Sequence, residues 1–200
     1  MRHAVQHLRR NDPVMAGIID RVGKYAIQYR PAEFESLVRS IVYQQLSGRV
    51  ASVIFARLLA AAGSPLTPSA ILKLRPARMR SLGLSKAKTD YIRDLARHTR
   101  DRKLVFEELS SLADHEVIER LTQVKGIGVW TAHMFLMFAL QRPDVLPVGD
   151  LGIRNAIRKA YALEVLPAPA EIEQMAEKWR PWCSVASWYL WRSLEGPAAL

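Results

Sequence analysis

Only one of the 200 residues is a cysteine, Cys183. A disulfide within the chain, a zinc site built on several cysteines and a Cys-ligated iron–sulfur cluster are therefore excluded, because each needs more than one thiol. The apolar runs fall short of the roughly 20 residues that a membrane-spanning helix requires. The N-terminal MRHAVQHLRRNDP is too polar for a secretory signal peptide. We therefore expect an intracellular protein with no membrane partner.

Acidic residues are scarce relative to basic ones. The chain has 19 Asp and Glu against 29 Lys and Arg, which gives a net charge of +10. The excess is uneven, since residues 72–103 hold eleven Lys or Arg and three Asp. This distribution favours a polyanionic partner such as nucleic acid. The candidates for contact there are Lys86, Lys88, Arg93 and Arg97, although a solvated basic surface explains each of them equally well.

Strand signals are almost missing, whereas helix signals recur along the whole chain. Asp12–Pro13 and Thr67–Pro68 both combine an N-cap residue with a first-turn proline. In FESLVRSIVYQQL the apolar residues recur at the spacing of one helical face. Later helices are predicted at residues 50–61, 86–99, 115–122, 128–140, 151–161, 170–178 and 182–195. The predicted fold class is all-α.

The stretch VKGIGVWTAHMF, residues 124–135, places two glycines one residue apart before a run of helix formers. One interpretation is a simple elbow between helices, because glycine adopts backbone conformations that other residues avoid. The other is an anion site, because such a turn exposes N–H groups at a helix start, where a phosphate binds. The two glycines alone leave both interpretations open.

A second motif, LPVGDLGIRNAI, covers residues 146–157. Its Asp150 follows a Pro-Val-Gly approach and stands directly before a helical pattern. Since Asp is a favoured N-cap residue, helix capping alone explains its presence. Capping and function are nevertheless compatible, because a carboxylate at the point where an extended chain enters a helix can also face a cleft.

Together with three further stretches, these motifs resemble the helix–hairpin–helix superfamily of base-excision DNA glycosylases. The glycine pair corresponds to the hairpin, and Asp150 to the essential Asp behind a Gly/Pro-rich loop. The other stretches occur in the family's order and are SIVYQQLSGRVA, SLGLSKAKTDYIRDLA and WRPWCSVASWYLW. The last is similar to the C-terminal helix of the 3-methyladenine DNA glycosylase II branch, the alkylbase glycosylases. The resemblance covers residues 34–191.

The resemblance implies a two-lobed helical fold with a DNA cleft between the lobes. One lobe would span residues 31–143 and end in the hairpin, and the other would join residues 1–30 to residues 144–200. The implied activity is monofunctional hydrolysis of alkylated purines, such as 3-methyladenine and 7-methylguanine, from double-stranded DNA by a monomer. Two alternatives remain: a non-enzymatic DNA-binding or damage-sensing hairpin protein, and a glycosylase for oxidised or deaminated bases.

Asp150 would be the catalytic residue of this activity. Breaking an N-glycosidic bond builds positive charge on the deoxyribose, and an ionised carboxylate near that carbon stabilises the transition state. Alkylated purines such as 3-methyladenine are cationic and hence good leaving groups. One carboxylate therefore suffices.

The pocket for the flipped base would be aromatic, because ring faces attract a cationic base. The resemblance assigns Trp130 and Trp182 to this pocket. Met134 stands where the alkylbase branch has a further aromatic residue, which puts the range of substrates in doubt. We expect Trp188 and Trp191 to belong to the core.

The resemblance assigns phosphate binding to backbone N–H groups around Gly126, Gly128 and Trp130, with Lys125 and Thr131 as neighbouring DNA contacts. Lys125 replaces a proline that is common in the family, and it adds a positive charge at the phosphate. Relatives that also cut the strand carry a Schiff-base Lys at the position of Trp130. We therefore expect no strand cleavage.

Hairpins of this superfamily often hold a monovalent cation, Na⁺ or K⁺, through backbone carbonyls. The carbonyls concerned would be those of Thr122, Val124 and Ile127. No other cofactor is expected.

A side chain must fill the gap that a flipped base leaves in the duplex. In the family this wedge lies after the first long helix, here at Gln44, Gln45, Leu46 and Ser47. A polar helix end explains the two glutamines equally well. Gln45 and Leu46 are both candidates for the wedge, and the register stays open.

Overall fold

The computed structural model describes residues 1–195, which form helices and no β-strand within that range. The all-α prediction is confirmed. Two compact units are present: a terminal unit, Met1–Tyr29 with Gln141–Leu200, and a central unit, Arg30–Leu140. The sequence placed the second boundary after residue 143, but residues 141–143 belong to the terminal unit. There the carbonyl of Arg142 accepts the Ser184 hydroxyl hydrogen at 2.7 Å, and that of Pro143 accepts the Ser184 N–H at 3.0 Å.

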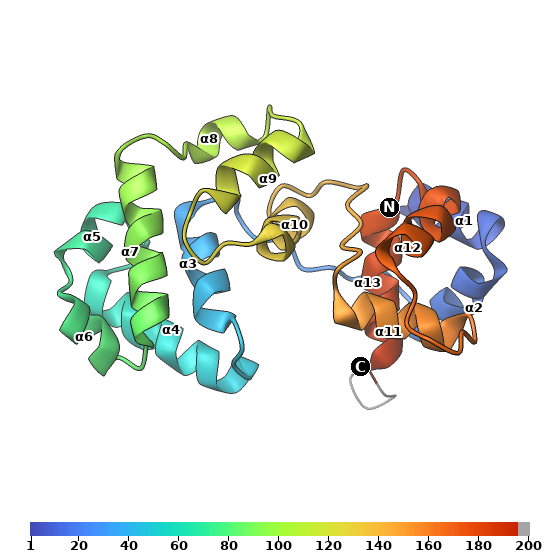
Figure 1. Ribbon diagram of the computed structural model, residues 1–200, viewed down its shortest axis with the longest axis horizontal. Helices are drawn as coiled ribbons and strands as arrows, with labels where there is room; N and C mark the ends of the chain where they lie inside the picture. The colour runs from blue at the N-terminus through green and yellow to red at the C-terminus, as the bar shows by residue number, and fades with distance from the viewer. Residues whose placement is uncertain (196–200) are drawn as a thin grey trace. The chain divides into compact units, whose positions relative to one another are not determined.

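The terminal unit combines helices from both ends of the described chain (Figure 1). They are α1 (Arg2–Asn11), α2 (Pro13–Val22), α11 (Leu151–Ala160), α12 (Pro169–Ala176), the 3₁₀ helix η1 (Glu177–Trp179) and α13 (Cys183–Leu194). Their apolar faces meet in one core in which Trp179 and Tyr189 are the largest fully buried side chains. Both α2 and α11 pack against α13, which makes α13 the central element of this unit.

Asp12 ties the N-terminal helices of this unit to η1. As predicted, it caps α2: Oδ1 accepts the N–H groups of Val14 and Met15. Oδ2 accepts the indole N–H of Trp179 at 2.8 Å and the hydroxyl hydrogen of Tyr161. Asp12 is completely buried, so these hydrogen bonds compensate for the removal of its charge from water.

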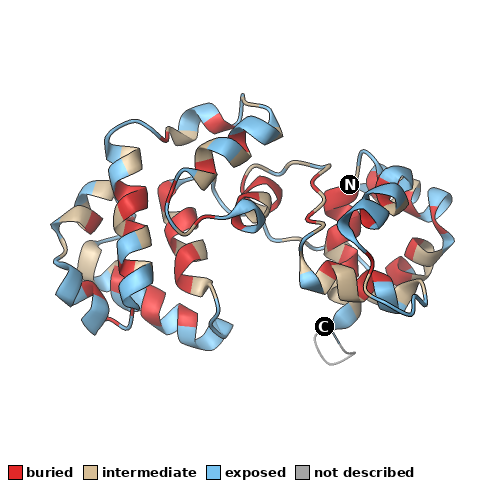
Figure 2. Cartoon of the chain, viewed as in Figure 1, coloured by how far each residue is buried: buried red, intermediate tan, exposed pale blue. Residues whose placement is uncertain are grey.

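The central unit is continuous in sequence. It contains α3 (Phe34–Tyr43), α4 (Gly48–Ala62), α5 (Pro68–Lys73), α6 (Pro76–Ser81), α7 (Lys86–Arg100), α8 (Phe106–Leu109), α9 (Asp114–Thr122) and α10 (Val129–Phe138). The apolar face predicted for α3 is buried, as Figure 2 shows for the inner faces of these helices. Helix α7 packs against α3, α5 and α6 and is thus the central helix of this unit.

Candidate active site

Asp150 lies at the N-terminus of α11, as the sequence predicts. Its Oδ1 accepts the N–H of Ile153 at 2.8 Å, which is a regular N-cap contact. The same oxygen accepts the indole N–H of Trp191 at 2.9 Å. Two donors from different helices therefore fix the orientation of this half-buried carboxylate, one from α11 and one from α13.

A glycine makes room for the contact between Asp150 and Trp191. A Cβ atom at Gly152 would lie 2.9 Å from Oδ1 of Asp150 and 3.1 Å from Cδ1 of Trp191. Any larger residue would force the indole and the carboxylate apart. Trp191 packs against the core of the terminal unit, as expected, and its indole N–H also orients Asp150, which the sequence did not indicate. Trp188 does pack in the core, against Tyr25 and Tyr189.

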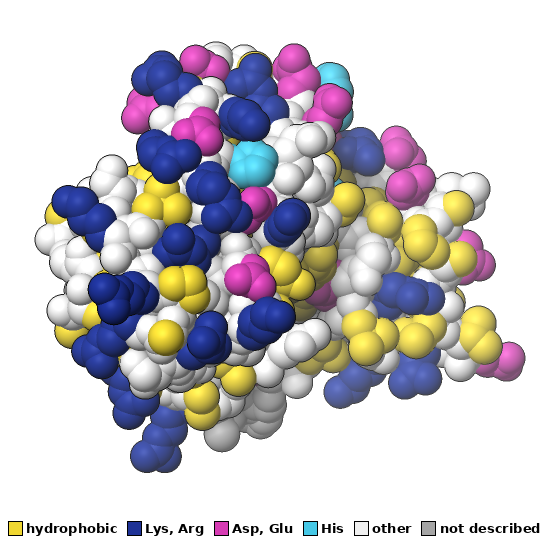
Figure 3. All heavy atoms as spheres, turned by 60° about the vertical axis from the view of Figure 1, so that its left-hand side comes forward, with side chains coloured by type: hydrophobic (Ala, Val, Ile, Leu, Met, Phe, Trp, Pro, Cys, Tyr) yellow, Lys and Arg dark blue, Asp and Glu magenta, His cyan; other side chains and the backbone are white. Residues whose placement is uncertain are grey.

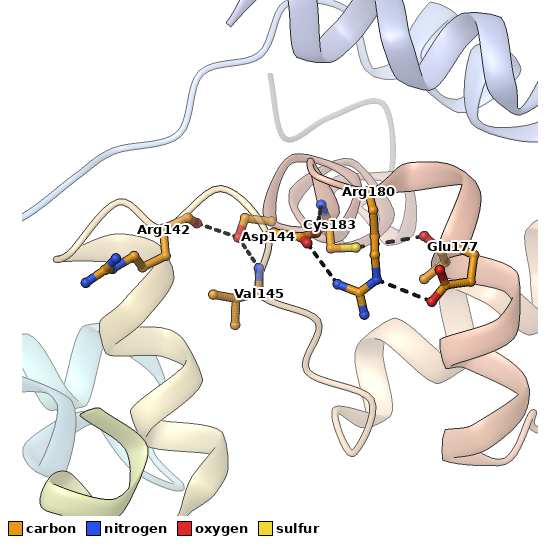
Figure 4. A network of polar contacts seen from close by, with 8 residues as sticks. Arg142, Asp144, Val145, Glu177, Arg180 and Cys183 are labelled. Carbon is orange, nitrogen blue, oxygen red and sulfur yellow. Dashed lines mark hydrogen bonds and ion pairs between the residues drawn. The ribbon is translucent and has the colours of Figure 1, made fainter. Parts of the chain in front are cut away.

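The loop that leads to Asp150 is anchored at the start of α13 (Figure 4). One carboxylate oxygen of Asp144 pairs with Arg180 at 2.8 Å, and the other accepts the N–H of Cys183 at 3.2 Å. The N–H of Val145 donates to the hydroxyl of Ser184 at 3.0 Å. Because α13 holds both the beginning of this loop and the carboxylate at its end, it sets the position of Asp150. Burial raises the pKa of the Cys183 thiol, so it is a packed group rather than a nucleophile.

The hairpin is the turn between α9 and α10. Its two glycines differ in whether the fold requires a glycine at that position. Gly126 has a φ of +81°, and a Cβ atom there would lie 2.1 Å from the ring of Tyr91. Gly126 is therefore required by the fold itself. Gly128 has an ordinary φ of −95°, and a Cβ atom there would meet nothing within 4 Å. Nothing within the described chain requires a glycine at position 128.

The hairpin is held by two side chains that the sequence analysis did not single out for this role. Oδ2 of Asp94, on α7, accepts the backbone N–H of Lys125 at 3.0 Å. Burial raises the pKa of Asp94, but hydrogen bonds from the Lys125 N–H and Arg97 outweigh burial, so the pKa lies below its ordinary value. Nε2 of Gln44 donates to the carbonyl of Gly126 at 2.9 Å. The Lys125 N–H is therefore used inside the protein, while its side chain is exposed.

A pocket of about 520 Å³ lies within the central unit beside the hairpin. Its lining includes the predicted pocket residues Trp130 and Met134, and the predicted DNA contacts Gln44, Gln45 and Thr131. The other lining residues are Arg30, Arg39, Ser40, Tyr43 and Phe138. Trp130 is 49% exposed. Thr131 lines the pocket but is only 6% exposed.

Trp182, the other predicted pocket residue, belongs to the terminal unit. It packs against the core of that unit as a partly buried side chain and precedes α13. The pocket of the central unit therefore does not include it.

The predicted wedge segment forms the turn between α3 and α4. Gln45 has a φ of +55°, a left-handed conformation that is uncommon for residues other than glycine and often marks a functional site. Gln45 and Leu46 are both exposed, Leu46 at 39%. The hydroxyl of Ser47 accepts the N–H of Val50 and so caps α4. Exposure is compatible with either wedge candidate.

The sequence matches the HhH-GPD superfamily of base excision DNA repair proteins over residues 38–181. The chain belongs to this superfamily. It is 36% identical to DNA-3-methyladenine glycosylase 1 of Schizosaccharomyces pombe over 183 residues, which cover 86% of this chain and 80% of that protein. It is 29% identical to the putative DNA-3-methyladenine glycosylase YfjP of Bacillus subtilis over 202 residues, which cover 98% of this chain and 70% of that protein.

Solved structures of HhH-GPD proteins share the fold. The DNA-3-methyladenine glycosidase of Bacillus halodurans superposes with a TM-score of 0.87 at 35% identity, covering 98% of this chain and 90% of that chain. The S. pombe 3-methyladenine DNA glycosylase Mag1, solved in complex with abasic DNA, superposes with a TM-score of 0.84 at 34% identity, covering 95% of each chain. The predicted family resemblance is confirmed.

The basic stretch of this HhH-GPD protein serves the fold more than the sequence indicates. Figure 3 shows Lys and Arg side chains spread over one face of the central unit. Yet Nζ of Lys88 donates to two carbonyls at the end of α3, and Arg93 donates to the carbonyl of Leu74 at 2.7 Å. Arg97 pairs with the carboxylate of Asp94. Lys86 is exposed. Within residues 1–195 no helix is long and apolar enough to cross a membrane.

Proposed function

We propose that this protein is a monofunctional DNA glycosylase that hydrolyses the N-glycosidic bond of alkylated purines in double-stranded DNA. The observation that carries the proposal is the Asp150 carboxylate, which two hydrogen bonds orient at a helix start in a chain whose relatives are named DNA-3-methyladenine glycosylases. The protein would act as a monomer inside the cell and leave an abasic site.

Asp150 supplies the charge that this reaction needs. As the base departs, positive charge accumulates on the sugar, and a carboxylate held in advance stabilises that charge without having to reorient. Its donors, the Ile153 N–H and the Trp191 indole, both reach Oδ1 and so direct the plane of the group. The attacking water adds to the sugar carbon, and the base leaves with the bonding electrons. Asp150 accepts the proton that this water loses.

The pocket of the central unit supplies a surface for the base. The half-exposed indole of Trp130 offers a ring face that attracts a cationic purine by about 0.5–2 kcal/mol. Met134 adds a flexible, polarisable side chain that adapts to bases of different shape. This lining supports the binding of 3-methyladenine and 7-methylguanine, which carry a positive charge in DNA.

The hairpin supplies the grip on the DNA backbone. The first N–H groups of a helix have no acceptor within that helix, and Gly128 has no side chain that could cap α10. Gly128 lies at the start of α10, and the fold does not require a glycine there. The absence of a side chain leaves space for the close approach of a phosphate. The exposed ammonium group of Lys125 adds a charge beside this site.

A monovalent cation, Na⁺ or K⁺, would assist this grip. The carbonyls of Thr122 and Val124 suit such an ion, because they are oxygen ligands at or just after the C-terminus of α9, where the helix dipole is negative. The carbonyl of Ile127 would join them from the turn before α10. The Val124 carbonyl also accepts the N–H of Ile127 at 3.1 Å, which uses one of its two lone pairs. The bound ion would add positive charge near the phosphate. Replacing Na⁺ and K⁺ by tetramethylammonium at constant ionic strength should weaken DNA binding.

The test is to incubate methylated DNA with the purified protein and identify the released bases by chromatography. We expect release of 3-methyladenine and 7-methylguanine, and little or no release of neutral 8-oxoguanine. DNA binding without release of any base would indicate a damage-sensing protein. Efficient release of 8-oxoguanine or deaminated bases, without methylpurines, would assign a different glycosylase activity.

A further inference from the structure

The wedge turn (residues 44–47) and the hairpin turn (residues 123–128) are joined within the central unit. The side chain of Gln44 donates to the carbonyl of Gly126 at 2.9 Å. The two turns are far apart in sequence, and each of them also contacts a different residue of α7. Helix α7 therefore contacts both turns to which the family resemblance assigns DNA binding.

Lys88 is the α7 residue that holds the wedge turn. Its Nζ donates to the carbonyl of Val42 at 2.8 Å and to that of Gln44 at 2.6 Å. These carbonyls lie at the C-terminus of α3, where a helix has no donors of its own and its dipole favours a cation. The contact fixes the end of α3 directly before Gln45, whose left-handed backbone must be stabilised by its surroundings. Burial lowers the pKa of Lys88, in line with an enclosed ammonium group.

Asp94 is the α7 residue that holds the hairpin turn. Asp94 is only 7% exposed, and its carboxylate accepts the N–H of Lys125 at 3.0 Å. That N–H lies directly before Gly126, where the backbone takes its left-handed turn. Arg97 pairs with the other oxygen of Asp94 at 3.1 Å and keeps the carboxylate in place.

The spacing between these two contacts is set by a regular helix. A rise of about 1.5 Å per residue places the Cα atoms of Lys88 and Asp94 about 9 Å apart along the axis of α7. A helix resists stretching, because every residue in its interior is hydrogen-bonded. Helix α7 therefore sets the distance between the two turns. The hydrogen bond between Gln44 and Gly126 also joins the turns directly to each other.

We propose that Lys88 and Asp94 are positioning residues that set the distance between the phosphate grip and the wedge. When the hairpin binds a backbone phosphate, this fixed distance delivers the wedge to the base that is to be extruded. Loss of the Lys88 contact uncouples extrusion of the base from binding of the DNA, whereas loss of the Asp94 contact disturbs the phosphate grip as well and weakens both. The inference rests on the proposed function for the identity of the DNA-contacting turns, but it concerns extrusion, which precedes bond cleavage.

Ordinary helix capping is the alternative explanation, and Arg93 is the matched control for it. Arg93 lies on the same helix and donates to the carbonyl of Leu74 at 2.7 Å, at the end of α5. It thus stabilises a helix end as Lys88 does, but it contacts neither of the two turns. If capping is the only role of Lys88, Lys88→Met and Arg93→Met should behave alike.

The experiment compares Lys88→Met, Asp94→Asn and Arg93→Met with the unmodified protein. Extrusion is measured by the fluorescence of 2-aminopurine placed beside a 7-methylguanine in duplex DNA, and binding by fluorescence anisotropy on the same duplex. We expect Lys88→Met to bind this DNA nearly normally and to lose most of the fluorescence rise. Asp94→Asn should weaken both signals. Single-turnover excision should fall by about tenfold to a hundredfold in both variants, because a misplaced group costs this much without unfolding.

Further variants keep the inference testable if Lys88→Met does not fold. Lys88→Arg retains the charge, the reach and donors for the two carbonyls and should restore extrusion. Lys88→Gln has donors but is shorter and uncharged, so it should not. The double variant of Lys88 and Asp94 should lose no more extrusion than the worse single variant, because both residues set one distance.

Several outcomes would overturn the inference. These are equal behaviour of Lys88→Met and Arg93→Met, normal extrusion by Lys88→Met, multiplicative losses in the double variant, or no fluorescence rise with the unmodified protein. The extrusion assay does not require bond cleavage. A protein that extrudes as expected but releases no base would contradict the proposed function and leave this inference standing.

Discussion

Trp191 donates its indole N–H to Oδ1 of Asp150 at 2.9 Å, from the last turns of α13 to the first residue before α11. The same oxygen accepts the N–H of Ile153 at 2.8 Å. A carboxylate with two donors on one oxygen has little rotational freedom, so the protein fixes its direction before any substrate binds. The contact between Trp191 and Asp150 links the catalytic candidate to the central helix of the terminal unit.

Replacing Trp191 by Phe should reduce excision without unfolding the protein. Phenylalanine retains most of the packing surface but has no N–H group, so Asp150 keeps its cap and loses one constraint on its direction. We expect single-turnover excision to fall about tenfold, with stability changing by about 1 kcal/mol. Trp188→Phe is the control, because that indole packs on Tyr25 and Tyr189 rather than on Asp150. Equal activity losses in the two variants would argue against an orienting role for Trp191.

Replacing Asp150 by Asn should separate its capping from its chemistry. Asparagine still offers an oxygen to the N–H of Ile153, so stability should change by less than the roughly 1 kcal/mol that loss of an N-cap costs. The negative charge is lost, and excision should fall by about 10²-fold or more. Binding to abasic-site DNA should persist. A variant with normal melting and near-normal excision would show that Asp150 is only a cap.

Alanine at each hairpin glycine should give opposite results. Gly126→Ala places a Cβ atom against the ring of Tyr91 at a positive φ, so we expect a loss of about 1–3 kcal/mol of stability. Gly128→Ala meets no atom of the described chain, so its stability should be unchanged or slightly higher. DNA affinity should nevertheless fall, because the methyl group occupies the space of the phosphate. Urea unfolding and anisotropy titrations measure the two effects. Normal DNA binding by Gly128→Ala would place the phosphate elsewhere.

The DNA strand should stay intact after base release. Strand cleavage in this superfamily requires an amine that forms a Schiff base with the sugar, and the corresponding position here is Trp130, which has no such amine. We expect alkali-labile abasic sites and no covalent adduct on treatment with borohydride. An adduct that disappears on replacing Lys125 would contradict both the monofunctional mechanism and the proposed role of Lys125 at a phosphate.

Asp12 should make the terminal unit sensitive to acid. Burial raises the pKa of Asp12, but hydrogen bonds from Trp179, Tyr161, Met15 and Lys178 outweigh burial and bring it below its ordinary value. A carboxylate with a depressed folded-state pKa contributes its full stability above the unfolded value of about 4. That contribution is lost as the pH falls from there through the folded-state pKa.

Asp12→Asn should therefore cost roughly 2–4 kcal/mol at neutral pH and show a weaker loss of stability below pH 4. Urea unfolding followed by Trp fluorescence measures this, because four of the five Trp residues lie in the terminal unit. Asp20→Asn is the control, since that exposed carboxylate pairs with Arg9 at the surface. An unchanged acid profile in Asp12→Asn would assign the acid sensitivity to other groups.

Local patterns in the sequence predict much of the fold and part of the site. The cap at Asp12, the buried face of α3 and the helix start at Asp150 are encoded within a few neighbouring residues, so each is visible in the sequence. The hairpin glycines are equally visible in the sequence. That the fold requires Gly126 but not Gly128 depends on Tyr91, which lies on another helix.

The partners of the site residues could not be predicted in the same way. Trp191 reaches Asp150 from a different helix, and Lys88 reaches the end of α3, because the fold brings distant segments together. No local rule distinguishes a basic residue that caps a helix from one that faces solvent. From the sequence, Lys88 and Arg93 are therefore predicted to be surface charges. One signal was available for α7: a charged residue, Asp94, falls on the buried face of this amphipathic helix.

The terminal unit consists of two segments separated by the whole of the central unit, and this order has a consequence for synthesis. Helices α1 and α2 leave the ribosome before the central unit, yet the residues that bury Met15, Ile18 and Ile19 arrive after it, with α11 and α13. Domains fold as units during translation, so the continuous central unit can close first. Meanwhile the apolar face of α2 is exposed to chaperones and to other nascent chains. A ribosome that stalls after α10 would display a finished hairpin and an uncovered hydrophobic helix on the same chain, without Asp150.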